Sequence, residues 1–435
     1  MTSLPAPALS ETAMALCILC IFLVPFALPG LALINTGLGR SRSSAHSMMA
    51  SLCMFAVAAL TYFVCGFSWQ GFIGLPAHSF SVGGKAWSLI AAEPFFMRGL
   101  DFNGSSASLA AWLQILCVGL AALIPLGAGS DRWRLSASCA STALLAGWTY
   151  PLFAHWVWGG GWLAQLGVNY GLGHGFIDAG GSSSIQVVGG LTALSIAWIL
   201  GARRGKYSSN GMPAAIPGHN SVFVLFGCLL AWVGWLGLNS AGAILFTGME
   251  IGRVPLVAVN TSLAAVSAGL TAAIVTRTRF GKPDASITAN GWIGGLVASS
   301  AGCAILKPAA AVIVGAVAGA LVTQAVDRFE FSLKVDDPGG AISVHALGGI
   351  WGVLAVGLFA AFSGSAPGQF LAQLIGIATL IGFVLPLTYG LNWLLNRLHP
   401  QRVAADGERQ GMDLHELGAD AYPEFVTHTE EFIQR

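Results

Sequence analysis

The sequence predicts an all-α polytopic membrane protein with eleven transmembrane helices. Only 9% of the 435 residues are charged, whereas a soluble domain carries about 25%. Hydrophobic residues make up 55% of the chain, and the mean hydropathy is +0.72. The apolar residues gather in runs long enough to cross a lipid bilayer as helices. A net charge of +1 leaves no basic face for nucleic acid. This composition excludes soluble enzymes, nucleic-acid-binding proteins and disordered regulators.

Eleven stretches of the chain meet the length requirement for a membrane-spanning helix. Such a helix needs about 20 mostly apolar residues to cross the hydrocarbon core. The 57 glycines spread through the chain favour helices that pack closely together. The predicted spans cover residues 12–35, 47–69, 108–129, 136–157, 182–201, 220–242, 255–276, 286–303, 308–326, 341–362 and 370–397.

An odd number of spans places the two termini on opposite sides of the membrane. Cytoplasmic segments are enriched in Lys and Arg. With the C-terminus inside, 16 of the 20 Lys and Arg residues fall in cytoplasmic segments and 4 in external ones. The sequence therefore predicts an external N-terminus and a cytoplasmic C-terminus (N-out/C-in). The longest external connection, about residues 70–107, is rich in Phe, Trp and Gly, which suggests a folded cap or an interfacial loop.

Two segments of the chain repeat each other. Residues 178–190 align without gaps with residues 337–349, and six of the 13 positions are identical. Each segment opens a predicted span, and five spans separate the two, so they enter the membrane from opposite sides. This pattern is typical of an inverted-topology repeat, here five spans plus five. In such folds the substrate path lies at the interface of the repeats, near the middle of the membrane.

The repeat places four polar side chains at matching positions. Asp178 and Asp337 lie just before their helices, where a carboxylate can cap free N–H groups. We favour structural or electrostatic support for these two residues over substrate contact. Gln186 and His345 follow eight residues later, ~12 Å deeper in the membrane. One such residue could simply join two helices, but a symmetry-related pair favours a central path that both side chains line.

The cysteines give no sign of a metal, cofactor or disulfide site. All eight lie in or beside apolar runs. Cys17 and Cys20 form a C-x-x-C pattern without His or acidic neighbours, and we expect them to pack as small residues. We also find no catalytic triad and no nucleotide-binding motif, so the sequence predicts a protein without enzymatic activity or cofactors.

Several motifs resemble the ammonium transporter, methylammonium permease and Rhesus family. They include residues 334–338 with the following Val344-His345-x-x-Gly-Gly-Ile-x-Gly, the segment 154–161, residues 234–239 and the tail segment 408–413. The resemblance implies eleven spans and a homotrimer with one pore in each subunit. It further implies a cell-membrane (inner-membrane) location, an ammonium or ammonia substrate, and a PII-type regulator as a possible partner of the cytoplasmic tail.

This chain departs from the pattern of the resembled family at the pore itself. In that family an aromatic vestibule recruits the cation, stacked phenylalanines gate the pore, and twin histidines line it. Here the second histidine is His345 and the first is replaced by Gln186. The gating phenylalanines fall on Cys117 and Leu238, the vestibule serine falls on Gly242, and Trp158 alone of the recruitment group is retained.

The departures predict a weaker cation site and an altered path. A cation over an aromatic face gains about 0.5–2 kcal/mol for each ring, and Cys117 and Leu238 have no ring to offer. Gln186 does not titrate near pH 7, yet it can hydrogen-bond His345 and hold one tautomer of it. We therefore expect an ammonium, ammonia or methylamine pore, with two alternatives. One is an ammonium sensor with little flux, and the other is a pore for another small neutral solute.

The sequence predicts two domains. Residues 1–398 form the membrane domain, with repeat one at about 12–201, repeat two at about 220–362 and the eleventh helix at about 370–397. Residues 399–435 are polar and charged, and we expect them to form a cytoplasmic regulatory tail.

Overall fold

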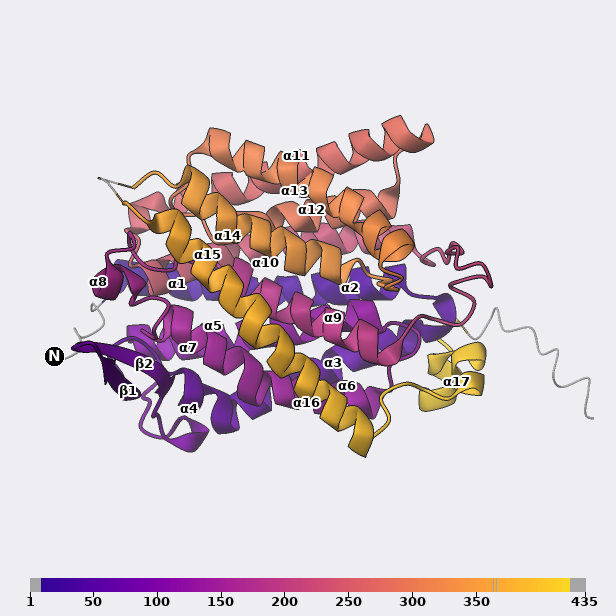
Figure 1. The fold of residues 1–435 in the computed structure, drawn as a ribbon, viewed down its shortest axis with the longest axis horizontal. Helices are drawn as coiled ribbons and strands as arrows, with labels where there is room; N and C mark the ends of the chain where they lie inside the picture. The colour runs from indigo at the N-terminus through magenta and orange to yellow at the C-terminus, as the bar shows by residue number, and fades with distance from the viewer. Residues whose placement is uncertain (1–8, 363, 365, 423–435) are drawn as a thin grey trace, which may run out of the picture.

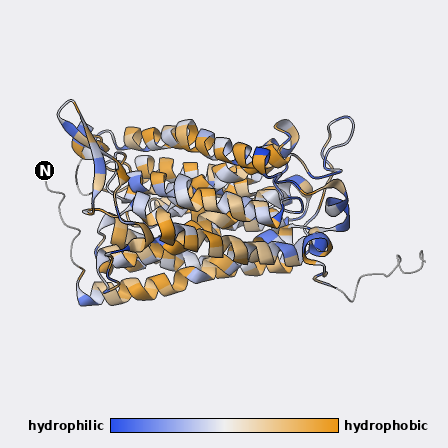
Figure 2. Cartoon of the chain, turned by 90° about the horizontal axis from the view of Figure 1, so that it is seen from below, coloured by the Kyte–Doolittle hydropathy of each residue, from blue (hydrophilic) through white to orange (hydrophobic). Residues whose placement is uncertain are grey.

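The protein is a bundle of long helices that run along a common direction (Figure 1). The computed structural model describes residues 9–422 except 363 and 365. Apolar residues cover the helices along their length, whereas hydrophilic residues gather at the two ends of the bundle (Figure 2). This distribution fits a helical protein whose middle lies in hydrocarbon and whose ends meet water.

Within the described residues, nine helical segments are long and apolar enough to cross a membrane. Each coincides with a predicted span, although most are longer. They are Glu11–Leu38, Ser41–Gln70, Ser106–Gly129, Ser182–Leu200, Ser221–Thr247, Ile251–Phe280, Pro308–Ser332, Ile342–Phe359 and Gln369–Leu398. The other two predicted spans, 136–157 and 286–303, also fall on helices. The first lies on 135–158 and carries several hydroxyl side chains near its start, and the second lies on a helix of only 16 residues.

The helices and strands have the following bounds. The α-helices are α1 Glu11–Leu23, α2 Ala27–Leu38, α3 Ser44–Thr61, α4 Phe67–Gln70, α5 Ser106–Gly129, α6 Leu135–Leu144, α7 Tyr150–Trp158, α8 Leu166–Tyr170, α9 Val188–Leu200, α10 Ser221–Thr247, α11 Val254–Phe280, α12 Ala285–Ser300, α13 Pro308–Asp327, α14 Gly348–Phe359, α15 Gln369–Thr379, α16 Leu385–Leu398 and α17 Ala405–Gln410. Short π-helical segments include η6 Ser182–Val187, η9 Ile342–Leu347 and η11 Asp413–Leu417. The strands are β1 Ala77–Val82 and β2 Lys85–Ala91.

Two helical segments form the centre of the bundle. In Ser106–Gly129 and Ser182–Leu200, 89% and 83% of the most apolar stretch is buried, against 28% in Ser41–Gln70. Both central segments are apolar all round, which is typical of helices that other helices surround. The second of them carries Gln186, so this polar side chain lies in the middle of the bundle.

The connection at residues 70–107 contains a β-hairpin that the all-α prediction did not anticipate. Strands β1 and β2 pair antiparallel across Gly83 and Gly84, whose positive φ angles of 59° and 76° suit a tight hairpin turn. The hairpin packs on α7, since Ser88 Oγ lies 2.9 Å from His155 Nε2. The indole of Trp156 donates a hydrogen bond to the carbonyl of Leu89 at 2.7 Å.

The segment after α16 folds against the opposite end of the bundle from the hairpin (Figure 1). Asp413 accepts a hydrogen bond from the backbone N–H of His46 at 2.7 Å, and the indole of Trp133 donates to Gln401 Oε1 at 3.0 Å. The first part of the predicted tail is thus fixed to the membrane domain. Residues 423–435, the rest of the predicted tail, lie outside the described residues.

Candidate functional site

The two repeat segments have the same local structure at their starts. Each begins with a glycine in the left-handed region, Gly181 with φ 95° and Gly340 with φ 67°, and continues as a π-helix, η6 or η9. The Asp178 carboxylate accepts hydrogen bonds from four backbone N–H groups, those of residues 181–184, at 2.7–3.0 Å. The Asp337 carboxylate accepts two, from residues 341 and 342, at 3.0 and 2.7 Å. Both carboxylates therefore cap the helices that carry the central polar pair.

Gln186 and His345 meet in the interior of the bundle. His345 Nδ1 lies 2.7 Å from Gln186 Oε1, and the two residues are 6% and 0% exposed. Because an amide oxygen only accepts, His345 Nδ1 carries the hydrogen, and in the neutral ring Nε2 keeps its lone pair. Gln186 Nε2 has no hydrogen-bond partner among the described residues. The pair thus offers one free acceptor and one free donor in a buried place.

Two glycines of the repeat allow this pair to approach. A Cβ atom on Gly190 would lie 2.4 Å from the backbone nitrogen of Ala346, and one on Gly349 would lie 2.5 Å from the carbonyl oxygen of Ser182. Side chains at these positions would push η6 and η9 apart. The second glycine of each repeat pair therefore sets the distance across which Gln186 reaches His345.

A cavity of about 600 Å³ opens at the hairpin end of the bundle. Trp158 and Asp178 belong to its walls, so the structure brings these two predicted site residues together. The Trp158 indole donates a hydrogen bond to the carbonyl of Asp178 at 2.6 Å. Trp158 is only 2% exposed, because the ring of Phe246 stacks on it with centroids 4.4 Å apart and planes at 13°. Sequence reasoning missed Phe246, although its position four residues after Gly242 places it on the same face of α10.

Gly242, the position of the vestibule serine in the resembled family, faces backbone rather than open space. A Cβ atom at this position would lie 2.4 Å from the carbonyl oxygen of Ala179. The segment that follows Asp178 therefore occupies the space that a side chain would need. Gly242 contributes no side-chain oxygen to cation binding, and its role in this chain is to let α10 pack against residue 179.

Cys117 and Leu238, at the positions of the gating phenylalanines, are both buried. Cys117 lies in the middle of α5 and is 0% exposed, and Leu238 lies in α10 and is 1% exposed. Both belong to the main apolar core of the bundle. Neither side chain can stack, and the stacked aromatic pair of Trp158 and Phe246 lines the cavity at the hairpin end instead.

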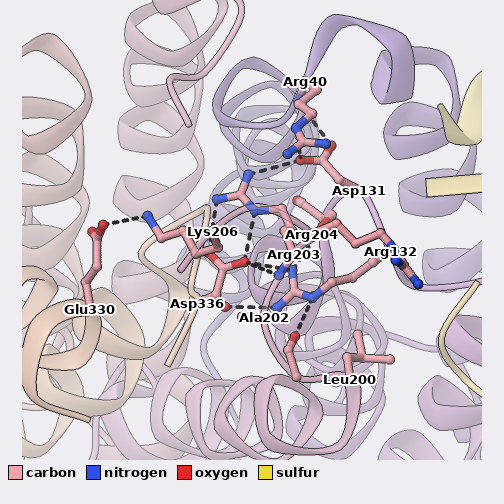
Figure 3. A network of polar contacts seen from close by, with 12 residues as sticks. Arg40, Asp131, Arg132, Leu200, Ala202, Arg203, Arg204, Lys206, Glu330 and Asp336 are labelled. Carbon is pink, nitrogen blue, oxygen red and sulfur yellow. Dashed lines mark hydrogen bonds and ion pairs between the residues drawn. The ribbon is translucent and has the colours of Figure 1, made fainter. Parts of the chain in front are cut away.

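A network of buried charges lies beside the start of the second repeat segment (Figure 3). The guanidinium of Arg203 binds both oxygens of the Asp336 carboxylate at 3.0 Å and Asp131 Oδ2 at 3.0 Å. Arg132 donates to the Asp336 carbonyl at 3.0 Å. Burial raises the pKa of Asp336, but Arg132 and Arg203 outweigh this effect and lower the pKa to about 2. Asp336 precedes Asp337, so the network fixes the chain immediately before the helix of His345.

The described residues offer no cluster of three or more His, Cys, Asp or Glu side chains for a metal ion. The side chains of the central pair are an imidazole and an amide, and the cavity at the hairpin end offers an indole and a benzene ring. These groups suit the binding of a small nitrogen compound by hydrogen bonds and cation–π contact.

Comparison with known proteins identifies the family. The model of the family described as "Ammonium Transporter Family" matches residues 15–422. The chain belongs to the ammonium transporter family. Its relatives include the ammonium transporter Amt2 of Archaeoglobus fulgidus, which is 35% identical over 95% of this chain and 89% of the relative. A putative ammonium transporter of Synechocystis is 31% identical over 91% of this chain and 86% of the relative.

Solved structures of family members have the same fold. A protein described as "Sensor Amt Protein" superposes with a TM-score of 0.83 at 28% identity, over 93% of this chain and 98% of that one. Mep2 of Saccharomyces cerevisiae superposes with a TM-score of 0.77 at 25% identity, over 90% of each chain. The relatives are transporters rather than enzymes, and family membership supports ammonium transport by a multi-pass membrane protein.

Proposed function

We propose that each subunit carries ammonium, ammonia or methylamine across the membrane along a path past Trp158, Gln186 and His345. The observation that carries this proposal is the buried hydrogen bond of 2.7 Å between His345 and Gln186, with one unpartnered donor on Gln186. A buried polar group without a partner is costly, and a passing molecule that both donates and accepts hydrogen bonds would relieve that cost. Ammonia does both.

The geometry suggests how a neutral molecule passes. The ammonium ion is recruited at the outer cavity beside Trp158 and gives up a proton to water there before ammonia enters the apolar interior, because an unpaired charge inside is expensive. An N–H of ammonia then donates to His345 Nε2, while the free N–H of Gln186 donates to the nitrogen lone pair. Gln186 does not titrate, so the pair provides no relay of two imidazoles for the proton.

Flux through purified protein tests the proposal. Proteoliposomes that contain the full chain should show an ammonium-driven change of internal pH or a transient current above that of empty liposomes. A matched variant, His345→Leu, removes the acceptor and should lower the flux. Equal signals from empty liposomes, the variant and the wild type would exclude the transport proposal.

A sensor with little flux is the second candidate. It is supported by the likeness to the protein described as "Sensor Amt Protein" and by the buried Cys117 and Leu238 in place of aromatic gating residues. Methylammonium binding without flux would favour the sensor. Equal permeability to urea or carbon dioxide would instead favour a pore for a small neutral solute.

The assembly and location of the protein also belong to this proposal. We place eleven spans, in a five-plus-five inverted repeat with N-out/C-in orientation, in the cell (inner) membrane as a homotrimer, with a PII-type regulator at the tail. Support comes from the family and from a tail that is fixed to the membrane domain through Asp413 and Gln401. Native mass measurement of the purified protein tests the trimer, and co-purification with a PII protein tests the regulator.

A further inference from the structure

The ring of Phe246 covers the aromatic face on which Trp158 would receive a cation. The two ring centroids are 4.4 Å apart and the planes differ by only 13°. A cation bound to a tryptophan lies over the ring face, within about 6 Å of the centroid. The Phe246 ring occupies that volume on one face, and Trp158 is only 2% exposed in total. A cation cannot reach this face while the two rings stack.

Phe246 is the partner in this stack that is better placed to move. The Trp158 indole is held by its hydrogen bond of 2.6 Å to the carbonyl of Asp178, and the Asp178 carboxylate is itself bound by the helix cap. Phe246 lies one residue before the end of α10, and the helix stops at Gly248 in the left-handed region with φ 64°. Its side chain makes no hydrogen bond, it borders the cavity of about 600 Å³, and its other aromatic contact is a tilted one with Phe72, whose ring centroid lies 6.5 Å away.

A negative charge draws cations to the same cavity. Glu250 lines it, and the carboxylate makes no hydrogen bond or ion pair with any described residue. Arg253 also lines the cavity and lowers the local attraction. The cavity therefore holds the free carboxylate of Glu250 and the indole of Trp158, one face of which Phe246 covers. These groups can bind a cation once the Phe246 ring moves away.

We propose that Phe246 weakens cation binding at the outer mouth by competing with an ammonium-type cation for the face of Trp158. Cation binding then requires the stack to open, and the lost contact between the two rings lowers the apparent affinity. This inference rests on the proposed recruitment role of Trp158. It assigns to this chain a weak cation site whose strength depends on one residue of α10.

Removal of the Phe246 ring should strengthen binding. In Phe246→Ala the face of Trp158 is open, and a cation gains contact with it without displacing a ring. The dissociation constant for methylammonium should fall by about 2- to 13-fold, the range that corresponds to the ring–ring contact that no longer has to be broken. Phe246→Leu keeps a bulky apolar group over Trp158 and should bind as the wild type does.

Equilibrium binding of labelled methylammonium to the full-length protein in lipid nanodiscs tests this inference without depending on flux. Phe246→Ala should bind more tightly, Phe246→Leu should be unchanged, and Trp158→Leu should weaken the Phe246→Ala variant more than it weakens the wild type. If Phe246→Ala does not fold, Phe246→Val, which leaves most of the Trp158 face open, replaces it.

Three results would overturn the inference. The first is an unchanged or weaker affinity of Phe246→Ala, or of Phe246→Val where it replaces Phe246→Ala. The second is a weaker affinity of Phe246→Leu, which would mean that the cation binds on the ring of Phe246 itself. The third is no detectable binding by any variant. Tighter binding without flux in proteoliposomes would preserve the inference and reject transport. Flux in the wild type, together with an affinity that Phe246→Ala does not change, would preserve the transport proposal and overturn the inference.

Discussion

Replacement of Gln186 by leucine should reduce ammonium flux because it releases the tautomer of His345. In the structure Gln186 Oε1 accepts the hydrogen of His345 Nδ1 at 2.7 Å, so Nε2 remains an acceptor for the passing molecule. Without this oxygen, Nδ1–H would be buried and unpaired, at a cost of about 1–3 kcal/mol. The population of the tautomer with hydrogen on Nε2 then rises about 5- to 150-fold relative to that of the tautomer with hydrogen on Nδ1. Flux should fall by up to the same factor, since that tautomer has no acceptor on the path.

The measurement is the initial rate of internal pH change in proteoliposomes after an ammonium gradient is imposed. Gln186→Leu should show the loss, whereas Gln186→His keeps an acceptor for His345 and should retain or raise the flux. The histidine also restores a second titratable ring, so the pH dependence of its flux should differ from that of the wild type. A folded Gln186→Leu protein with flux within about twofold of the wild type would refute the reasoning, because the hydrogen bond would then have no part in transport.

Two further predictions concern stability. The pKa of Asp336 is about 2 in the folded state against the usual 3.8, so its interactions with Arg132 and Arg203 add about 2 kcal/mol of stability. This gain is complete above about pH 5 and is lost as the pH falls toward 2. The thermal midpoint in detergent should drop over that range, and Asp336→Asn, already destabilised at pH 7, should drop less. Gly349→Ala should prevent correct folding, because its Cβ would lie 2.5 Å from the carbonyl oxygen of Ser182. The matched control is Gly382→Ala, whose Cβ would have no atom within 4 Å. In size-exclusion chromatography the control should elute as the wild type does and Gly349→Ala should not. Equal elution of the two alanine variants would contradict the close approach.

The sequence predicts the helical part of the fold well because apolar length alone determines it. All nine long apolar segments fall on predicted spans, and α12, Ala285–Ser300, begins one residue before the predicted span 286–303 and ends within it. The connection at residues 70–107 was predicted only as a folded cap or an interfacial loop. Its hairpin is fixed by contacts that are remote in sequence, such as those of Ser88 with His155 and of Leu89 with Trp156. No local pattern of the chain reveals such contacts.

The central pair shows what a repeat adds to sequence reasoning. The alignment of residues 178–190 with 337–349 places Gln186 opposite His345 without knowledge of any contact, and the structure brings the two side chains to 2.7 Å. The sequence does not reveal that both helices begin as π-helices. Nor does it reveal the charge network, because Arg203 and Asp336 are 133 residues apart along the chain.

The structure also connects the departure at Gly242 with Phe246, a residue that the sequence did not single out. The absence of a serine at position 242 follows from packing, since the carbonyl oxygen of Ala179 lies 2.4 Å from the place of a Cβ atom. One helical turn later, Phe246 covers Trp158. A serine at position 242 would therefore displace residue 179 and still leave the Trp158 face closed. Recovery of a strong cation site in this chain must begin with Phe246, because only its removal exposes an aromatic face that the fold already holds in place.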